Sequence, residues 1–571
     1  IITLEVAKFV PLNKSIKNYH HIVLLYFMTS EIQTLKNLYE LIEISSSRFP
    51  DRVALSEYKN NQIIALTYSE LLYAIEKKSN EISKLAIPKG SNIALSGANS
   101  INWVITFFSI LKVGHIVVPI DSKMNQQGME FILNFTNTQL FIVDNVSSIK
   151  ISDKFKTIIQ EMDHVLIKLE AEENKNLQST ILLKNVTNIN EEEKNDVAQI
   201  LFTSGTTGEP KGVVLTHKNI LSNIKDIHEI LPTKNYEKSF SILPLHHVYE
   251  LTCSLLHNLS KGNSIHFCSK IDLVTMVREM KIIKPTIWPV VPLILEKIYK
   301  NINKNVSKSL IQKILLKFAP KLFGYILRKK LGLKELGLLL SGGAALNTTV
   351  EKFFKDIGMT VTQGYGLSEA SPLISVNPLG NERIGSVGKI IKSCEVIIEN
   401  KNSLDHGVIT VKGPNIFSGY YKNKEYSNQI LKNGWLNTGD IGYMDSDGYL
   451  YITGRDKFVI VNKGGKNIYP EEIEEFFSSS SFIKDIIIFS NDDENIIALI
   501  RPDDELFERE SIDTIKKIVY ESCLEVNQKL EGYKRIKEIY ITNKDFEKTS
   551  TQKIKRSFLK NINLSEYISA K

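Results

Sequence analysis

The sequence predicts a multidomain α/β protein, and three observations support this fold class. From about Leu35 onward, short Val- and Ile-rich runs alternate with amphipathic helical patterns, which is typical of a parallel sheet covered by helices. Beyond Pro372 the pattern changes to short strands between glycine turns, which predicts a small barrel or sandwich. After Arg455 comes a compact α+β segment, and a chain of 571 residues is too long for one core.

The elements of the first region follow in order. Residues 66–85 carry apolar side chains at helical spacing and predict a helix, and residues 91–97 predict a buried strand. The longest apolar stretch, residues 101–120, contains Lys112 and His115, so we expect a buried helix, a stop at Gly114 and a core strand instead of a membrane span. Further elements are expected as strands at 139–144 and 264–269, a helix near 251–259, helices at 470–477 and 511–530, and strands at 483–490 and 496–502.

The domain boundary is expected at Arg455. The large domain would span residues 28–455, with the barrel part at about 373–455, and the small domain would span 456–571. Residues 1–27 precede the first methionine, Met28, and the apolar run there is too short for a secretion signal. We therefore expect residues 1–27 to be a non-native or disordered leader.

The overall composition is that of an ordinary globular protein. Apolar residues make up 43% and charged residues 24% of the chain, and 71 Lys and Arg against 64 Asp and Glu give a net charge of +7. This mild excess is compatible with anionic ligands or a membrane surface, and no basic, aromatic-interleaved stripe indicates nucleic-acid binding. The four cysteines are far apart, which argues against a cysteine-ligated metal.

One charge run stands out between Lys297 and Lys330. Its lysines are interleaved with Leu, Ile, Phe and Tyr, a pattern that predicts a basic amphipathic helix. Such a helix can lie on an anionic membrane surface. The alternative, a solvated helix face in a lysine-rich sequence, is favoured on composition.

The stretch "TSGTTGEPKG", Thr203 to Gly212, predicts a phosphate-binding loop. Glycines and hydroxyls let successive backbone N–H groups surround anionic oxygens, and Lys211 adds a charge. The loop is not a Walker motif, because the glycine-to-lysine spacing differs and strands, not a strand and a helix, flank it. This excludes a Walker-type motor ATPase. On its own, the loop has one alternative interpretation, a mobile hairpin loop, and phosphate binding is favoured over it.

Other segments make the loop part of a larger pattern. Glycine-rich runs occur at 342–346 and 363–372, and the run 435–455 places Asp440 and Arg455 near turns. The small domain contains the runs "KGGK" and "TSTQKIKR". Together, from Leu35 to Leu559, these segments resemble the adenylate-forming (AMP-binding, acyl-activating) superfamily.

This resemblance implies a fold and a reaction. The fold would be a large N-terminal domain of α/β subdomains plus a distorted β-barrel, with a small mobile C-terminal domain. The reaction would join a carboxylate to ATP as acyl-AMP with release of pyrophosphate, and then pass the acyl group to a thiol, usually of coenzyme A. ATP, Mg²⁺ and coenzyme A are therefore the expected cofactors.

The resemblance also assigns roles to residues. Cofactor contacts are expected from Thr203, Ser204, Gly205, Thr206, Thr207, Gly208 and Lys211 on the β- and γ-phosphates, from Gly343, Ala344, Ala345, Gln363, Gly364, Tyr365 and Gly366 around adenine, from Ser368 on the α-phosphate, from Asp440, Ile452 and Arg455 on the remaining nucleotide, and from Gly464 and Gly465 beside pantetheine. Glu369 resembles the Mg²⁺ ligand, with Thr203 as a second contact. Lys553 resembles the catalytic lysine, preceded by Gln552 where the family commonly has glycine, and Asp456 resembles the hinge.

The run "LPLHHVYELTCSLL", 243–256, bears on the substrate. We expect neighbouring His246 and His247 to point in different directions, which argues against joint metal ligation. The resemblance places His247, as a catalytic residue, beside the acyl carboxylate, and with Glu250 the run resembles the long-chain fatty acyl branch. The expected function is a long-chain fatty acid–CoA ligase, cytoplasmic or peripheral on the inner face of a membrane. The alternatives are a ligase that uses acyl carrier protein and a non-catalytic lipid- or nucleotide-binding homologue.

Overall fold

The structure is a computed structural model of the chain. It describes residues 32, 34–145, 151–152, 155, 159–162, 196–203, 210–231, 236–461, 467–478, 480, 482–491, 495–548 and 554–570. The expected leader, residues 1–27, lies outside this set.

A seven-stranded sheet forms one layer of the large domain. In hydrogen-bonded order its strands are β18 (Gly419–Tyr420), β8 (Lys211–Thr216), β7 (Val197–Thr203), β4 (Ile116–Ile120), β3 (Asn92–Ser96), β5 (Leu140–Val143) and β6 (Ile159–Glu161). Strands β3 to β7 pair in parallel, whereas β7, β8 and β18 pair antiparallel. The stretch 101–120 is confirmed as helix α5 (Ile101–Lys112), a left-handed Gly114 and buried strand β4. Ser100 starts α5 by accepting a hydrogen bond from the Trp103 amide at 3.1 Å.

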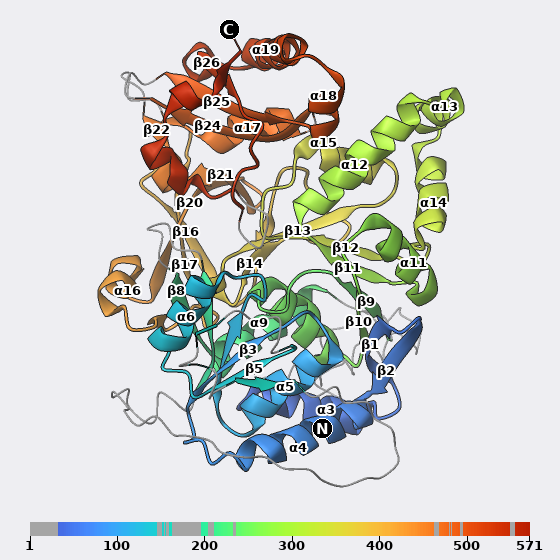
Figure 1. The fold of residues 1–571 in the computed structure, drawn as a ribbon, viewed down its shortest axis with the longest axis vertical. Coiled ribbons are helices and arrows are strands. Elements are labelled where there is room, and N and C mark those ends of the chain that lie inside the picture. Colours follow the sequence, from blue (N-terminus) through green and yellow to red (C-terminus); the bar gives the residue numbers. More distant parts are fainter. Residues whose placement is uncertain are drawn as a thin grey trace.

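A second, larger sheet runs through the centre of the molecule (Figure 1). Its order is β16 (Glu395–Glu399), β17 (Gly407–Lys412), β20 (Trp435–Met444), β21 (Tyr449–Arg455), β15 (Gly388–Ile390), β14 (Leu373–Val376), β13 (Val361–Gly366), β12 (Leu338–Ser341), β11 (Ile287–Val290), β9 (Lys238–Ser241), β10 (Ser264–Phe267), β1 (Val53–Lys59) and β2 (Gln62–Thr67), with β19 (Leu431–Lys432) beside β20.

At strand β13 the strand pairing of this sheet changes from parallel to antiparallel. This strand pairs in parallel with β12 on one side and antiparallel with β14 on the other. The short strands that the sequence predicted beyond Pro372 are present, and their hydrogen-bonded order continues the parallel strands instead of forming a separate sheet. A residue at the end of β13 therefore lies between the parallel and the antiparallel part.

Helices cover both sheets. Those of the large domain are α3 (Leu38–Arg48), α4 (Tyr68–Ser83), α5, α6 (Gln126–Phe135), α9 (His217–Ile230), the π-helix η2 (Tyr249–Leu256), α10 (His257–Ser260), α11 (Leu273–Ile283), α12 (Pro292–Ser307), α13 (Leu310–Phe318), α14 (Pro320–Leu331), α15 (Thr348–Asp356), η3 (Ser368–Ala370) and α16 (Lys424–Ile430). The short helix η4 (Asp456–Phe458) directly follows the boundary expected at Arg455. Within the described ranges, no helix is both long and apolar enough to cross a membrane.

The basic run between Lys297 and Lys330 differs from the prediction. Instead of one amphipathic helix it forms three, α12, α13 and α14. The first helix ends at Ser307, and Ser309 caps the second by accepting a hydrogen bond from the Gln312 amide. Pro320 starts the third helix at a position where its missing N–H costs nothing. In Figure 1, α13 and α14 project from the body at one side.

The C-terminal region has a core of its own. Strands β24 (Ile483–Ser490), β25 (Ile496–Pro502), β26 (Glu538–Ile541) and β27 (Ile568–Ser569) form a sheet, β22 (Ile460–Val461) pairs with β23 (Asn467–Ile468), and the helices are α17 (Pro470–Ser478), α18 (Asp504–Arg509), α19 (Ile512–Lys529), η5 (Gly532–Lys534), η6 (Arg556–Asn561) and η7 (Leu564–Glu566). Polar contacts join this region to the large domain. The Asn347 amide donates to the Glu475 carbonyl at 2.9 Å, and the Lys300 ammonium donates to the Ile483 carbonyl at 3.0 Å.

Two histidines, one on α9 and one on α10, are buried side by side. The rings of His228 and His257 lie 5.1 Å apart edge to face, and the His228 ring bonds the Ser260 hydroxyl at 2.6 Å. Neither ring nitrogen of His257 has a hydrogen-bond partner among the described residues. Burial, and then the nearby charge of Lys261, hold the pKa of both histidines well below the usual value. Both therefore bind a proton less readily in the folded protein than in the unfolded chain.

We predict that His257→Leu makes the protein less sensitive to acid. A histidine with a lowered pKa in the folded state binds its proton more readily when unfolded, so stability falls as pH drops below about 6.5. Leucine removes this group and breaks no hydrogen bond to a described residue. Calorimetric unfolding midpoints at about pH 7.5 and about pH 5 should differ less in the variant than in the wild type. Equal differences would contradict the prediction.

Candidate functional site

The candidate site lies at the carboxyl ends of β12 and β13. Gly342 to Ala345 follow β12, and Tyr365 and Gly366 end β13. In open α/β sheets this edge is where ligands commonly bind. Gly343 has φ of +84°, a conformation that glycine adopts without strain, and it is exposed together with Ala344 and Ala345. These three backbones are therefore accessible to a ligand.

Asp440 is the centre of a polar cluster beside this edge. The Tyr365 hydroxyl donates to Asp440 Oδ2 at 2.8 Å, and Arg455 Nε lies 3.0 Å from Asp440 Oδ1. The sequence had placed Asp440 and Arg455 near turns, but they face each other across the paired strands β20 and β21. The Asp440 carboxylate raises the pKa of Arg455. Ile452 lies on the same strand as Arg455, half-buried, and Gln363 and Gly364 precede Tyr365 on β13.

At the base of the phosphate-type loop, Tyr420 contacts both Lys211 and the Glu369 carboxylate. Thr203 ends β7, Lys211 starts β8, and the two residues are direct partners in the antiparallel pair. Lys211 Nζ lies 5.6 Å from the ring centroid of Tyr420, whose hydroxyl donates to Glu369 Oε1 at 2.6 Å. Burial, and then the Glu369 carboxylate, raise the pKa of Tyr420. Glu369 and its neighbour Ser368 thus lie close to the loop that they were predicted to serve.

Sequence reasoning missed two aromatic residues here. Lys211 Nζ lies 3.3 Å from the ring centroid of Tyr426 and also near Tyr420. Both tyrosines come from a segment more than two hundred positions after the loop, brought in because β18 pairs with β8. No local pattern in the sequence marks them.

Lys457 was also missed. It lies in η4, next to the expected hinge Asp456. It is accessible to solvent, but partial desolvation, followed by the charge of Arg455, lowers the pKa of Lys457 to about 8. Arg455, Lys457 and Lys211 therefore form a cationic wall to the site, which suits an anionic ligand.

Eight predicted site residues lie outside the described residues. They are Ser204, Gly205, Thr206, Thr207, Gly208, Gly464, Gly465 and Lys553.

The predicted acyl segment forms the π-helix η2, an uncommon element that is frequent at functional sites. The Tyr249 ring of η2 packs on the backbone of Gly342, where an added Cβ would come within 3.3 Å of it. Just before η2, the rings of His246 and His247 lie 4.3 Å apart, so the expectation that they point in different directions is wrong. Burial, and then His246, lower the pKa of His247 to about 3, which keeps its ring neutral.

Glu250 of η2 is an acid in an apolar environment. Its side chain is fully buried, and this burial raises its pKa to about 7 even though the hydroxyls of Ser241 and Ser254 oppose the shift. Glu250 therefore holds a proton at higher pH than an exposed carboxyl group does, and in its protonated form it adds no negative charge to the segment.

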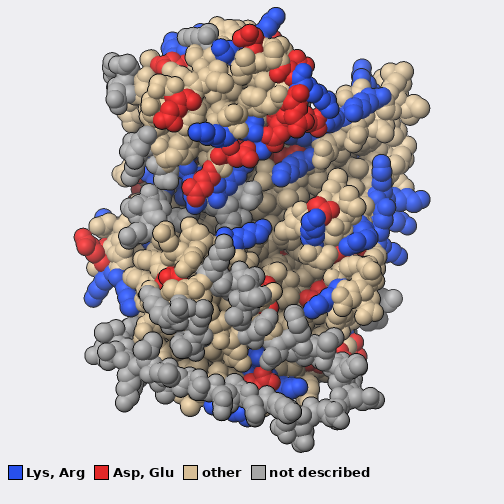
Figure 2. Space-filling model, viewed as in Figure 1, with Lys and Arg blue, Asp and Glu red and all other residues tan. Residues whose placement is uncertain are grey.

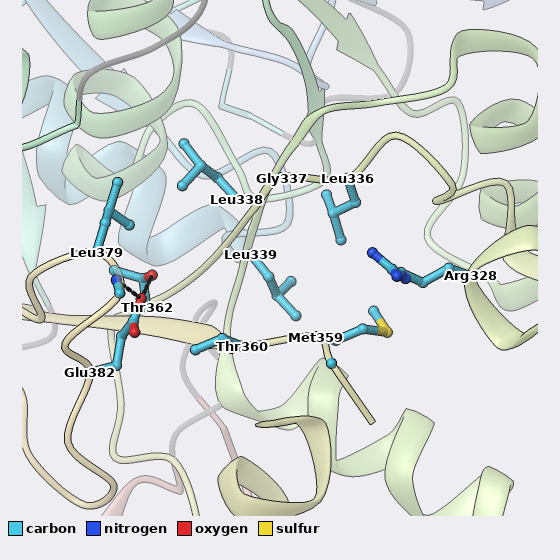
Figure 3. Close-up of a pocket in the computed structure, with 12 residues that line it drawn as sticks. Arg328, Leu336, Gly337, Leu338, Leu339, Met359, Thr360, Thr362, Leu379 and Glu382 are labelled. Atoms are coloured by element: carbon cyan, nitrogen blue, oxygen red, sulfur yellow. Dashed lines mark hydrogen bonds between the residues drawn. The ribbon is translucent and has the colours of Figure 1, made fainter. Parts of the chain in front are cut away.

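A pocket of about 330 Å³ lies elsewhere on the large sheet (Figure 3). Leu338, Leu339 and Thr362 line it, with Arg328 and Glu382 on opposite sides. These strand residues precede the carboxyl ends of β12 and β13, so the pocket opens toward the amino ends of the strands. It is therefore separate from the candidate site.

Gly366→Ala should damage both stability and the site. A Cβ at Gly366 would lie 1.8 Å from the Pro372 carbonyl oxygen, and backbone atoms cannot move aside as a side chain can. We expect a loss of about 3 kcal/mol in the free energy of unfolding and a drop in ATP–pyrophosphate exchange. Gly364→Ala is the matched control, because the nearest atom to its Cβ would be a Leu373 methyl group at 3.2 Å and the nearest backbone atom, the Ser375 carbonyl oxygen, would be at 3.4 Å. Similar thermal midpoints for both variants would contradict this reading.

The two domains, the paired strands β7 and β8 and the cluster around Asp440 are the arrangement expected of an adenylate-forming enzyme. The chain belongs to the AMP-binding enzyme family, which matches residues 42–421, and the C-terminal domain of AMP-binding enzymes matches residues 456–568. The fold that the sequence predicted is confirmed by this match and by the similar structures.

Individual relatives of the chain include ligases that act on long-chain fatty acids. The chain is 30% identical to a long-chain-fatty-acid–CoA ligase of Bacillus subtilis (strain 168), over 79% of this chain and 82% of that protein. It is 27% identical to the chloroplastic long-chain-fatty-acid–[acyl-carrier-protein] ligase AEE15 of Arabidopsis thaliana, over 84% of this chain and 78% of that protein. Among solved structures, o-succinylbenzoate coenzyme A synthetase from Bacillus subtilis in complex with AMP superposes with a TM-score of 0.71 at 21% identity, covering 92% and 98% of the two chains.

Proposed function

We propose that the protein activates a long-chain fatty acid with ATP through acyl-AMP and then transfers the acyl group to coenzyme A. The observation that carries this proposal is the convergence of Lys211, Tyr420 and Glu369 on one side and of Asp440 and Arg455 on the other at one edge of the sheet. The names of the B. subtilis and A. thaliana relatives support a fatty acid as the substrate.

In the first step a carboxylate oxygen attacks the α-phosphorus of ATP, a P–O bond forms, and pyrophosphate leaves. Both reactants are anions, so the main task of the protein is to hold them together. Lys211 and the loop residues Ser204, Gly205, Thr206, Thr207 and Gly208 bind the β- and γ-phosphates, and Ser368 binds the α-phosphate. Lys553 closes over the α-phosphate and stabilises the charge that develops there.

The nucleoside lies along β13 and β20. Gly343, Ala344 and Ala345 stack on one face of adenine, and Gln363, Gly364, Tyr365 and Gly366 lie on the other. The Asp440 carboxylate accepts from the ribose hydroxyls, with Ile452 beside the sugar and Arg455 bridging to the phosphate. The 3.0 Å contact between Arg455 and Asp440 supports this role, because it holds the carboxylate in one orientation.

Glu369 fits the role of a Mg²⁺ ligand. Its carboxylate is half-buried at the base of the loop, and carboxylate and hydroxyl oxygens are the donors that this hard cation prefers. Glu369 and the Thr203 hydroxyl would hold the ion. There it would neutralise phosphate charge, while Tyr420 orients the carboxylate.

The acyl carboxylate lies beside His247. A neutral ring with a pKa of about 3 can donate a hydrogen bond without forming an ion pair that would trap the substrate. In the second step the thiol sulfur of coenzyme A attacks the acyl carbonyl carbon, a C–S bond forms, and AMP leaves with the bonding electron pair. For this step the small domain rotates at Asp456, and Gly464 and Gly465 let pantetheine pass close to the backbone.

The carrier-protein ligase among the relatives supports a second acceptor. An acyl carrier protein presents the same pantetheine thiol on a protein surface, so the adenylation step would be unchanged. The two acceptors differ only in what must dock beside the small domain.

The test is a panel of carboxylates in ATP–pyrophosphate exchange, followed by thioester formation with coenzyme A or with acyl carrier protein. The panel runs from acetate through palmitate and oleate and includes oxalate and o-succinylbenzoate. We expect exchange to be fastest with the long-chain acids and the thioester to form with coenzyme A. Fast exchange only with a short or aromatic acid would refute the substrate, and transfer only to carrier protein would refute the acceptor. Exchange with none would revive the non-catalytic alternative.

A further inference from the structure

Helix α13 presents an unusual apolar surface. None of its side chains is buried, and Leu310, Ile311 and Phe318 are 73%, 78% and 75% exposed. With Ile314 they follow one face of the helix, whereas Leu315 and Leu316 on the other face pack against the core of the domain. Contiguous exposed apolar side chains of this kind mark an interaction site.

Helix α14 extends the same surface and anchors it. Leu322, Tyr325 and Ile326 are exposed, while Phe323 and Gly324 are buried. A Cβ at Gly324 would lie 1.8 Å from the Ile357 carbonyl oxygen, so α14 packs directly on the chain that follows α15. The exposed face is therefore held rigidly by the body of the large domain.

The charge of this segment is of one sign. Between Glu296 and Glu335 the sequence has eleven Lys and Arg and no Asp or Glu. Within the described part of the chain, only Lys304 of these eleven has an ion pair, with Glu505. Figure 2 shows the basic side chains projecting where Figure 1 places α14, beside the mostly uncharged tip that carries α13.

We infer that α13 and α14 dock on the surface of an anionic lipid bilayer. Apolar side chains flanked by exposed lysines such as Lys313, Lys317 and Lys321 match the boundary between acyl chains and negatively charged headgroups. The helices, of nine and twelve residues, are too short to cross a bilayer and would lie along it. The surface of an acidic protein could pair with the lysine charges. It would not bury the protruding side chains of Ile311 and Phe318 as deeply as the acyl chains of a bilayer would.

Vesicle sedimentation with the full chain tests this inference. We expect binding to vesicles of phosphatidylcholine mixed with phosphatidylglycerol, little binding to phosphatidylcholine alone, and weakening with added salt. The double variant Ile311→Asp, Phe318→Asp should bind the anionic vesicles at least about tenfold less, and so should Lys313→Glu, Lys317→Glu. These side chains are exposed, so thermal midpoints and ATP–pyrophosphate exchange should stay at wild-type values.

Two controls match these variants. Val274→Asp changes an apolar side chain that is 80% exposed on α11, and Lys424→Glu, Lys432→Glu reverses two exposed lysines far along the chain. Both should bind vesicles like the wild type. An equal loss of vesicle binding in the test and control variants would overturn the inference. So would wild-type binding that is the same with and without phosphatidylglycerol. So would absence of binding together with a dimer, seen by sedimentation, that Ile311→Asp, Phe318→Asp dissociates. Since no substrate is involved, this result is independent of the proposed reaction.

Discussion

Lys553→Ala is expected to slow acyl-adenylate formation by about 10²–10³, because a preorganised charge at the α-phosphate contributes roughly 3–4 kcal/mol to the barrier. Lys553 lies outside the described residues, and its role is proposed from the resemblance of "TSTQKIKR". The lysine acts only while the small domain is in the adenylating orientation. Formation of the thioester from supplied acyl-AMP should therefore remain near the wild-type rate.

The two half-reactions are measured separately, as ATP–pyrophosphate exchange and as thioester release from synthetic acyl-AMP. Lys555→Ala is the matched control, since Lys555 is two positions away and is paired with Glu547. It should leave both rates nearly unchanged. Equal loss of both half-reactions in Lys553→Ala, or an equally inactive Lys555→Ala, would refute the assigned role.

Asp440→Ala is expected to lower kcat/KM for ATP by about 10², mostly through KM. A charge-assisted hydrogen bond contributes roughly 1.5–3 kcal/mol, and the substitution removes the acceptor proposed for the ribose hydroxyls. It also leaves the Tyr365 hydroxyl and Arg455 without their shared partner. Exchange kinetics against ATP concentration measure the effect.

Tyr365→Phe distinguishes the role of the Asp440 carboxylate from the role of the hydrogen bond that Tyr365 donates to it. It removes the 2.8 Å hydrogen bond to Asp440 Oδ2 and leaves the carboxylate and its contact with Arg455 in place. We expect a loss smaller than about tenfold, the value of one hydrogen bond. An unchanged KM for ATP in Asp440→Ala, or a larger loss in Tyr365→Phe, would exclude Asp440 as the ribose acceptor.

Local features could be predicted well from the sequence. The helix–glycine–strand unit at 101–120 and the strands on both sides of the phosphate-type loop are confirmed, because cap residues, glycine stops and the spacing of apolar residues act over a few positions. The superfamily was also recognisable, since its motifs are short and ordered along the chain. The roles of the site residues stay proposals.

Features that depend on distant segments could not be predicted. Three short helices replace the single basic helix, His246 and His247 lie together, and Asp440 meets Arg455 across a strand pair. Tyr420 joins Lys211 to Glu369 although no sequence pattern marks it.

By itself, then, the sequence determined the elements, the motif residues and the class of enzyme, because each is encoded within a few neighbouring positions. Only the tertiary structure decided which side chains meet, which acids and bases change their pKa, and which apolar face stays uncovered. These properties arise from strand pairing and burial between residues hundreds of positions apart, and no local spacing records them.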